Sequence, residues 1–241
     1  MQCGRAPVRS FQRTDASAEP FPSAATSGIM GRQNGEETMA GTADQGIQKA
    51  WELLEALRTG DVCRTAAVRF DAATKRYIVR SFGRDIVVSL SDRSVSGLDR
   101  SPGVVSGEYA ELFPLAVLWY LVLAKDIAPS GRLVHLEDLS GGDIFARGSH
   151  VLPLGQVAHR YGSDREGFLN RGRTFGGEPA ALADAAVRFA PLPRVPVTMT
   201  LWLADEEFPA RAGLFFDSTC SLQLPTDILW SLARLCCLAL R

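Results

Sequence analysis

The sequence has little lysine and histidine and no closely spaced pair of cysteines that could chelate a metal. Lysine occurs only at positions 49, 75 and 125, and the formal net charge is −1. With no strong positive field, the composition does not predict a protein that binds nucleic acid or an anionic membrane. The five cysteines are odd in number and contain no CxxC pair, which argues against a disulfide framework and a thiolate-only metal site. We interpret them as small buried apolar residues in a reducing cytoplasm.

Long apolar runs and familiar catalytic motifs are also missing. The longest apolar run, Leu115 to Ala124, has ten residues, whereas a helix needs roughly 20 to cross a bilayer. It predicts a central buried helix over residues 114–124, because Pro114 suits a first helical turn. The chain contains no GxGxxG, GxxxxGK[ST], GxSxG or HExxH, so no dinucleotide, P-loop, serine-hydrolase or zincin reading has support.

Residues 1–41 differ in composition from the rest of the chain. They are rich in Ser, Ala, Gly, Pro and Arg and show no apolar period, which predicts a disordered leader. Met39 lies inside this segment, so translation beginning there is an alternative. Thr42 to Gln45 has the form of a capping box, which predicts that a single domain, residues 42–241, opens with a helix over residues 43–58.

The remaining periodicity predicts an α+β fold. Residues 67–70, 77–82 and 86–90 alternate like strands of an antiparallel meander. Residues 186–189 and the stretch from Pro191 to Leu224 predict a further strand and a C-terminal hairpin, and residues 226–240 predict a last helix. We expect the N-terminal meander and the C-terminal hairpin to form one antiparallel or mixed sheet packed against several helices.

The hairpin carries the best candidates for chemistry. Asp205, Glu206 and Glu207 follow its first strand, and Asp217 ends its second. Because the two ends of a hairpin loop return to each other, we expect Asp217 near Asp205 or Glu207. Clustered carboxylates share a cation or raise one another's pKa, and both effects serve catalysis. The alternative is a solvated acidic turn, or carboxylates that accept N–H groups and shape the loop.

A second candidate lies in the glycine-rich segment around His150. This histidine is a candidate ligand or general base, and a structural hydrogen bond is the alternative. We predict that His150 and the acidic turn line one groove, with Phe145 and Phe208 as its apolar floor. Arg147, together with Arg171 and Arg173, is a candidate for holding an anionic ligand, and surface solvation is the alternative.

The chain resembles a known family at GGDIFARGSH and DEEFPARAGLFFDST. The matching residues are Gly141, Gly142, Phe145, Gly148, His150, Gly176, Gly177, Pro193, Pro196, Trp202, Asp205, Glu207, Phe208, Pro209, Phe216 and Asp217. This set resembles the family catalogued as domain of unknown function 3786, found mostly in anaerobic bacteria and archaea, over roughly Ile47 to Leu240. Some relatives carry an added cysteine-rich iron–sulfur domain, which implies a link to anaerobic redox or corrinoid metabolism.

These observations lead to three functional hypotheses. Cys3 is the only cysteine before Cys63, so the chain has no cluster of its own, and an iron–sulfur or corrinoid cofactor would enter only through a partner. The first hypothesis is a cytoplasmic accessory or binding protein with such a redox or corrinoid partner. The second is a metal- or acid–base-dependent enzyme that uses Asp205, Glu207, Asp217 and His150. The third is a purely structural interaction module. The oligomeric state, the ligand and the identity of any metal stay open.

Overall fold

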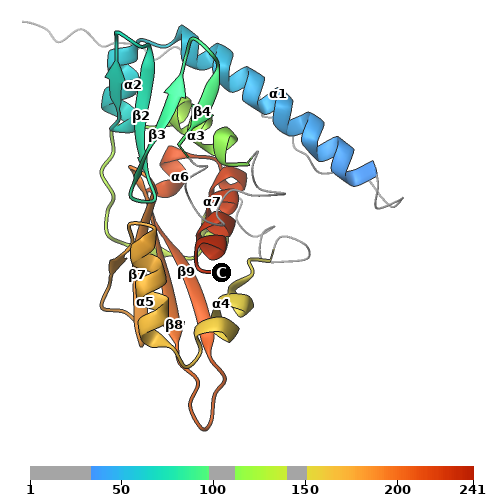
Figure 1. The fold of residues 1–241 in the computed structure, drawn as a ribbon, viewed down its shortest axis with the longest axis vertical. Helices are drawn as coiled ribbons and strands as arrows, with labels where there is room; N and C mark the ends of the chain where they lie inside the picture. Colours follow the sequence, from blue (N-terminus) through green and yellow to red (C-terminus); the bar gives the residue numbers. More distant parts are fainter. Residues whose placement is uncertain (1–33, 98–111, 140–150) are drawn as a thin grey trace, which may run out of the picture.

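A computed structural model of the chain describes residues 34–97, 112–139 and 151–241, with side chains from residue 44 onward. Figure 1 shows helices and two antiparallel sheets, which confirms the predicted α+β class. The sheets have the strand orders β1-β2-β3-β4 and β5-β9-β8-β7-β6. The meander and the hairpin therefore belong to two separate sheets, not to the one sheet that the sequence predicted. Most of the predicted leader, residues 1–33, lies outside the described residues.

The first helix begins earlier than predicted. Helix α1 spans Asn34–Ala56, so Thr42 lies inside it and does not cap its start. Trp51 and Leu54 are buried and face α3, and Gly46 lets α1 approach Leu115 closely. The short helix α2, Thr59–Ala66, follows directly. Figure 1 shows the first turns of α1 extending beyond the body of the protein.

The first sheet is the predicted meander with one additional strand. Its strands are β1 (Arg69–Asp71), β2 (Arg76–Ser81), β3 (Arg84–Ser89) and β4 (Ser94–Ser96). Phe82 and Gly83 join β2 to β3 with φ of 46° and 73°. Two consecutive residues with positive φ form the tight turn whose twist suits a two-residue hairpin.

Helix α3, Leu112–Leu123, lies at the centre of the core, as its apolar run predicted. Residues from Phe113 to Leu121 are buried, apart from Pro114 and Leu115, and α3 packs against α1, α2 and α7. It has 12 residues, and no helix in the described part of the chain has both the length and the apolarity to cross a membrane.

The second sheet has one face in the core and one face turned away from it. Its strands are β5 (Leu133–Val134), β6 (Glu178–Pro179), β7 (Ala185–Leu192), β8 (Val195–Trp202) and β9 (Arg211–Asp217). Val187, Met199 and Leu214 belong to the core cluster. Trp202 and Phe215 do not belong to it and are partly exposed, because alternate residues of a strand point to opposite faces.

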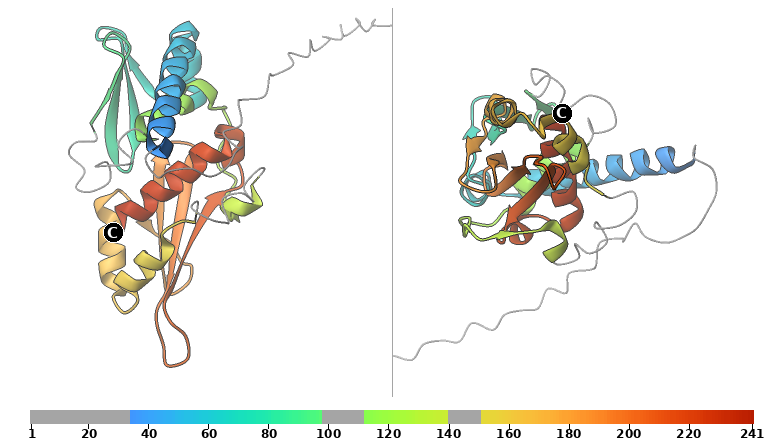
Figure 2. Two further views of the ribbon diagram at one scale, coloured as in Figure 1. Left: turned by 90° about the vertical axis from the view of Figure 1, so that its right-hand side faces the viewer. Right: turned by 90° about the horizontal axis from the view of Figure 1, so that it is seen from below.

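Helices complete the core on one side of this sheet. They are the 3₁₀ turn η2 (Leu136–Asp138), α4 (Leu154–Tyr161), α5 (Arg165–Thr174), α6 (Cys220–Gln223) and α7 (Thr226–Ala239). Figure 2 shows α7 crossing the sheet, with α4 and α5 beside it. Cys220, Cys236 and Cys237 are free and buried, and burial raises the pKa of Cys220 to about 12. These three residues confirm the interpretation of cysteine as a small apolar residue.

Two turns meet where the two sheets join. One is the β2–β3 turn, which contains Gly83, and the other follows α5 and contains Gly176. The Cα of Gly176 lies only 2.7 Å from where a Cβ on Gly83 would be, and φ is positive at both glycines. Beside them, the Ser81 hydroxyl donates to the carbonyl oxygen of Pro191 (2.6 Å), and the Phe82 ring meets the Phe189 ring edge-on. Only glycine allows backbones to come so close in this conformation.

The turn between β7 and β8 satisfies the C-terminal end of α2. The Arg194 side chain donates to the carbonyl oxygens of Thr65 (2.8 Å) and Arg64 (3.1 Å), and its guanidinium also contacts Asp126. The Tyr120 hydroxyl donates to the carbonyl oxygen of Ala66 (2.8 Å). The last carbonyl groups of a helix lack partners within it. The left-handed Ala67 caps α2 locally by donating its N–H to the carbonyl oxygen of Cys63, and these tertiary contacts satisfy the carbonyl groups that follow.

Candidate functional site

The acidic turn lies in the loop that joins β8 to β9, residues 203–210, which we call the hairpin loop. Figure 1 shows it projecting from the bottom of the second sheet. Oδ1 of Asp205 accepts hydrogen bonds from the N–H groups of Glu207 (2.9 Å) and Phe208 (2.7 Å). The N–H groups of Phe208 and Glu207 lower the pKa of Asp205 by stabilising its carboxylate. Asp205 therefore shapes the loop, as an aspartate commonly does in a turn.

The rest of the hairpin loop faces solvent. Phe208 is 63% exposed, and Glu206 and Glu207 are exposed beside it. Within the described part of the chain, neither glutamate has an ion pair. The base of the loop is fixed, since Leu203 N–H donates to Asp184 Oδ2 (2.8 Å) and Ala204 N–H donates to the carbonyl oxygen of Gly162 (2.8 Å). The result is an aromatic side chain with two carboxylates, held away from the body on an anchored loop.

Asp217 lies at the other end of β9, which corrects the expectation that it meets Asp205 or Glu207. Arg211 pairs with Trp202 beside the loop, whereas Asp217 pairs with Leu133 on β5. Asp217 lies six residues beyond Arg211 along the strand, which corresponds to about 20 Å at the usual rise of a strand. The expected carboxylate cluster therefore does not form.

Asp217 is buried and fully engaged. Its Oδ1 accepts hydrogen bonds from the N–H and hydroxyl groups of Ser130 and of Thr219, at 2.7 to 3.0 Å, and its Oδ2 accepts from Gly131 N–H (2.6 Å). Its exposed fraction is 1%. Burial raises the pKa of Asp217, but these hydrogen bonds outweigh it and lower the pKa to about 2. Asp217 is thus a permanent anion that fastens residues 130 and 131 to the end of β9.

A comparison with protein families now identifies the chain. The family described as Domain of unknown function (DUF3786) matches residues 59–239. The chain belongs to this family. No curated protein and no solved structure matches the chain.

Several residues that carry the DUF3786 resemblance have packing roles. Gly176 makes the contact with Gly83, and a Cβ on Gly177 would lie 2.3 Å from Val187. The carbonyl oxygen of Pro196 faces the thiol of Cys220 at 3.8 Å. These residues allow the second sheet to pack closely against the elements beside it. At these positions the family resemblance therefore reflects the packing of the fold.

Of the other predicted site residues of this DUF3786 chain, the structure describes only Arg171 and Arg173. His150, Phe145 and Arg147 lie outside the described residues, so the groove shared by His150 and the acidic turn stays a prediction. Arg171 lies over the Phe175 ring at 4.8 Å. Arg173 donates to Asn170 Oδ1 (2.6 Å). Among the described residues, no three His, Cys, Asp or Glu side chains are grouped so that they could hold a metal ion.

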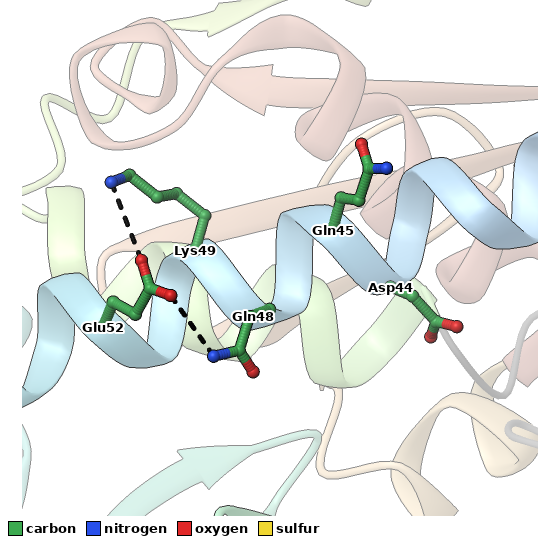
Figure 3. Close-up of a pocket in the computed structure, with 5 residues that line it drawn as sticks. All are labelled: Asp44, Gln45, Gln48, Lys49 and Glu52. Atoms are coloured by element: carbon green, nitrogen blue, oxygen red, sulfur yellow. Dashed lines mark hydrogen bonds and ion pairs between the residues drawn. The ribbon is translucent and has the colours of Figure 1, made fainter.

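A shallow hollow of about 410 Å³ lies along α1, at the other end of the molecule from the hairpin loop. Figure 3 shows the side chains that line it, which are Asp44, Gln45, Gln48, Lys49 and Glu52. Glu52 accepts a hydrogen bond from Gln48 (3.3 Å) and lies 3.8 Å from Lys49 Nζ. These exposed side chains contact one another. Among the described residues, the hollow has no set of polar groups that converge on a position for a ligand.

Sequence reasoning missed the partners of Asp217 and the role of Arg194. Ser130 and Gly131 are 87 and 86 residues away from Asp217, and Arg194 reaches carbonyl groups some 130 residues earlier. The local sequence carried one usable signal, Asp217 followed by Ser218 and Thr219, because an aspartate often accepts the N–H two residues on. Nothing in the sequence indicated the distant donors.

Proposed function

We propose that this DUF3786 chain is a cytoplasmic accessory protein that binds a partner protein through the hairpin loop. The observation that carries the proposal is the 63% exposure of Phe208 on a loop that Asp205 shapes and that Asp184 and Gly162 anchor. Aromatic side chains contribute strongly to binding when a partner buries them, and a fixed loop loses little conformational entropy on binding.

Charge supports the same proposal. Glu206 and Glu207 directly precede Phe208 and have no ion pair in the described part of the chain, so a partner with an apolar pocket and a cationic side chain next to it fits the loop. The acid–base enzyme hypothesis required Asp217 to join Asp205 and Glu207, and β9 separates them. The resemblance adds that the partner is a redox or corrinoid protein, and this stays a prediction.

Affinity capture from the native host tests the proposal. The wild-type protein and Leu182→Ser should retain one partner that Phe208→Ser loses; Leu182 is a suitable control because it is also exposed, at 41%. With both proteins purified, Phe208→Ser should raise the Kd about tenfold or more, as for a central binding residue. Equal affinities for Phe208→Ser and Leu182→Ser would contradict the proposal. Visible absorbance of the purified partner then reports an iron–sulfur or corrinoid group.

A further inference from the structure

Trp202 and Arg211 form the last cross-strand pair of β8 and β9 before the hairpin loop. Their side chains lie on the outer face of the second sheet, because the neighbouring Leu201 and Ala212 face the core cluster and alternate residues point to opposite faces. The guanidinium carbon of Arg211 lies over the Trp202 ring, 5.4 Å from its centroid. Arg211 is exposed, and the indole beneath it is partly exposed.

This stacking orients the guanidinium of Arg211 and leaves its N–H groups available. The face of an indole attracts a cation, and the planar guanidinium also stacks on it. In the part of the chain that the structure describes, no carboxylate forms an ion pair with Arg211 and no other group accepts a hydrogen bond from its side chain. Its donors can therefore bind a carboxylate of another molecule through two parallel N–H···O bonds.

The carboxylates of the hairpin loop lie close to Arg211 in the sequence and do not neutralise it. Oδ1 of Asp205 accepts from N–H groups of the loop itself. Glu206 and Glu207 are exposed and have no ion pair among the described residues. Charges of opposite sign thus stay separate on one anchored loop, with Phe208 between them in the sequence. Such a surface is complementary to a partner that carries both signs of charge.

We propose that the partner protein presents a carboxylate to Arg211, beside the pocket that receives Phe208. This proposal rests on the proposed function and names the chemistry of the partner. The same partner surface carries a lysine or arginine for Glu206 and Glu207 and an aspartate or glutamate for the guanidinium. Two contacts of opposite sign fix the orientation of the partner on the loop, which an apolar contact at Phe208 alone does not.

A protein carboxylate fits this guanidinium better than the phosphates of a nucleic acid or a membrane. Polyanions of that kind bind clusters of basic side chains. Arg211 is the one basic residue between positions 203 and 217, and the same stretch contains four acidic residues. The exposed Glu206 and Glu207 repel a polyanion, whereas a single carboxylate suits an isolated guanidinium.

Selected peptides test this surface without the native partner. The probe is a disulfide-closed dodecapeptide, selected on the wild-type protein from a displayed random library with Phe208→Ser as the counter-selection. Selected peptides should contain an aspartate or glutamate, and Arg211→Gln should raise their Kd about fivefold or more. The control Arg76→Gln removes another exposed arginine, on β2, and should change the Kd less than about twofold. Peptides that require Phe208 and bind Arg211→Gln like the wild type overturn the proposal, as does a library without Phe208-dependent binders.

A double-mutant cycle identifies the contact. Replacing the acidic residue of the peptide by its amide should weaken binding to the wild type about as much as Arg211→Gln does, and should weaken binding to Arg211→Gln little further. Additive losses overturn a direct contact. Arg211 is exposed, so Arg211→Gln should keep the wild-type melting temperature within a few degrees. If Arg211→Gln does not fold, the amide peptide decides, because unchanged binding of that peptide to the wild type overturns the proposal.

The native partner separates this proposal from the proposed function. With the captured partner purified, Arg211→Gln should raise its Kd about fivefold or more, and Arg76→Gln should not. If Phe208→Ser loses the partner while Arg211→Gln binds it like the wild type, the carboxylate contact is overturned and the proposed function stands. If Phe208→Ser and Leu182→Ser bind the partner equally, the proposed function itself fails.

Discussion

The hairpin loop and the far end of β9 use aspartate in the same local way and with different consequences. Asp205 and Asp217 both accept N–H groups from residues two or three positions on, and both pKa values are lowered. Among the residues that the structure describes, Asp205 has only these local donors. Asp217 adds donors from Ser130 and Gly131, far away in the chain. An aspartate with local donors shapes a loop, whereas an aspartate with distant donors holds the fold together.

The largest expected effect is at the Asp217 end. Asp217→Ala removes the buried carboxylate that accepts from Ser130, Gly131 and Thr219, and water can replace part of these bonds because Ser130 and Gly131 are exposed, so we expect a loss of about 2–3 kcal/mol in the free energy of unfolding. Urea denaturation measures it. Asp205→Ala should leave the denaturation midpoint nearly unchanged, and equal losses in both variants would remove the distinction between the two ends.

A second substitution tests the junction of the two sheets. Gly176→Ala places a Cβ 2.5 Å from the Cα of Gly83 at a φ of +66°, so we expect a loss of roughly 2–3 kcal/mol. The control is Gly155→Ala in α4, where a Cβ meets nothing within 4 Å. Alanine favours a helix, so this control should be neutral or slightly stabilising. Thermal denaturation compares the stability of the two variants. If Gly176→Ala were as stable as the wild type, the close contact between Gly176 and Gly83 would be contradicted.

The pH dependence of stability distinguishes the two aspartates again. The folded-state pKa of Asp217 is about 2, below its ordinary value of 3.8, so the folded state holds fewer protons between these values. Its contribution, on the order of 2 kcal/mol, is complete above about pH 4 and is lost as the pH falls toward 2. Asp217→Asn should flatten the stability profile in this window. If Asp217→Asn kept the wild-type dependence of stability on pH in this window, the lowered pKa would belong to a different residue.

The smallest effect on stability is expected at the hairpin loop. Phe208→Ser removes a side chain that is 63% exposed, so the melting temperature should stay within about 1–2 °C of the wild type. Differential scanning fluorimetry measures it, with Leu182→Ser alongside. A loss of several degrees in Phe208→Ser alone would show that the ring packs on the protein and is not free to dock.

The sequence predicted elements well where periodicity is strong. The apolar run of α3 and the alternation of β7 to β9 are local properties, and these four elements were predicted within a few residues. The start of α1 was not predicted, because residues 34–41 lack an apolar period and the capping pattern at Thr42 also fits a helix interior. Division into two sheets was missed because strand pairing depends on distant contacts, such as the pairing of Leu133 with Asp217.

The candidate site was predicted less well for a related reason. The turn at Asp205 follows from a short polar loop and was one of the alternatives that the sequence left open. Phe208 was predicted as part of a groove floor, whereas among the described residues its side chain is 63% exposed. The position of Asp217 depends on where the strand pairs, and the sequence shows only that Asp217 follows an apolar strand. Because β9 has seven residues, the side chain at its last position lies far from the loop that precedes its first position.

The contact between Gly83 and Gly176 has a consequence for insertions and deletions. Each turn fills the space that the other would need in order to lengthen, so one added residue in either turn displaces both sheets. The hairpin loop has no such opposing backbone at Glu206 to Phe208, where side chains face solvent. Variation in length can therefore accumulate at the hairpin loop while the junction keeps its length, and partner specificity can change there without altering the fold.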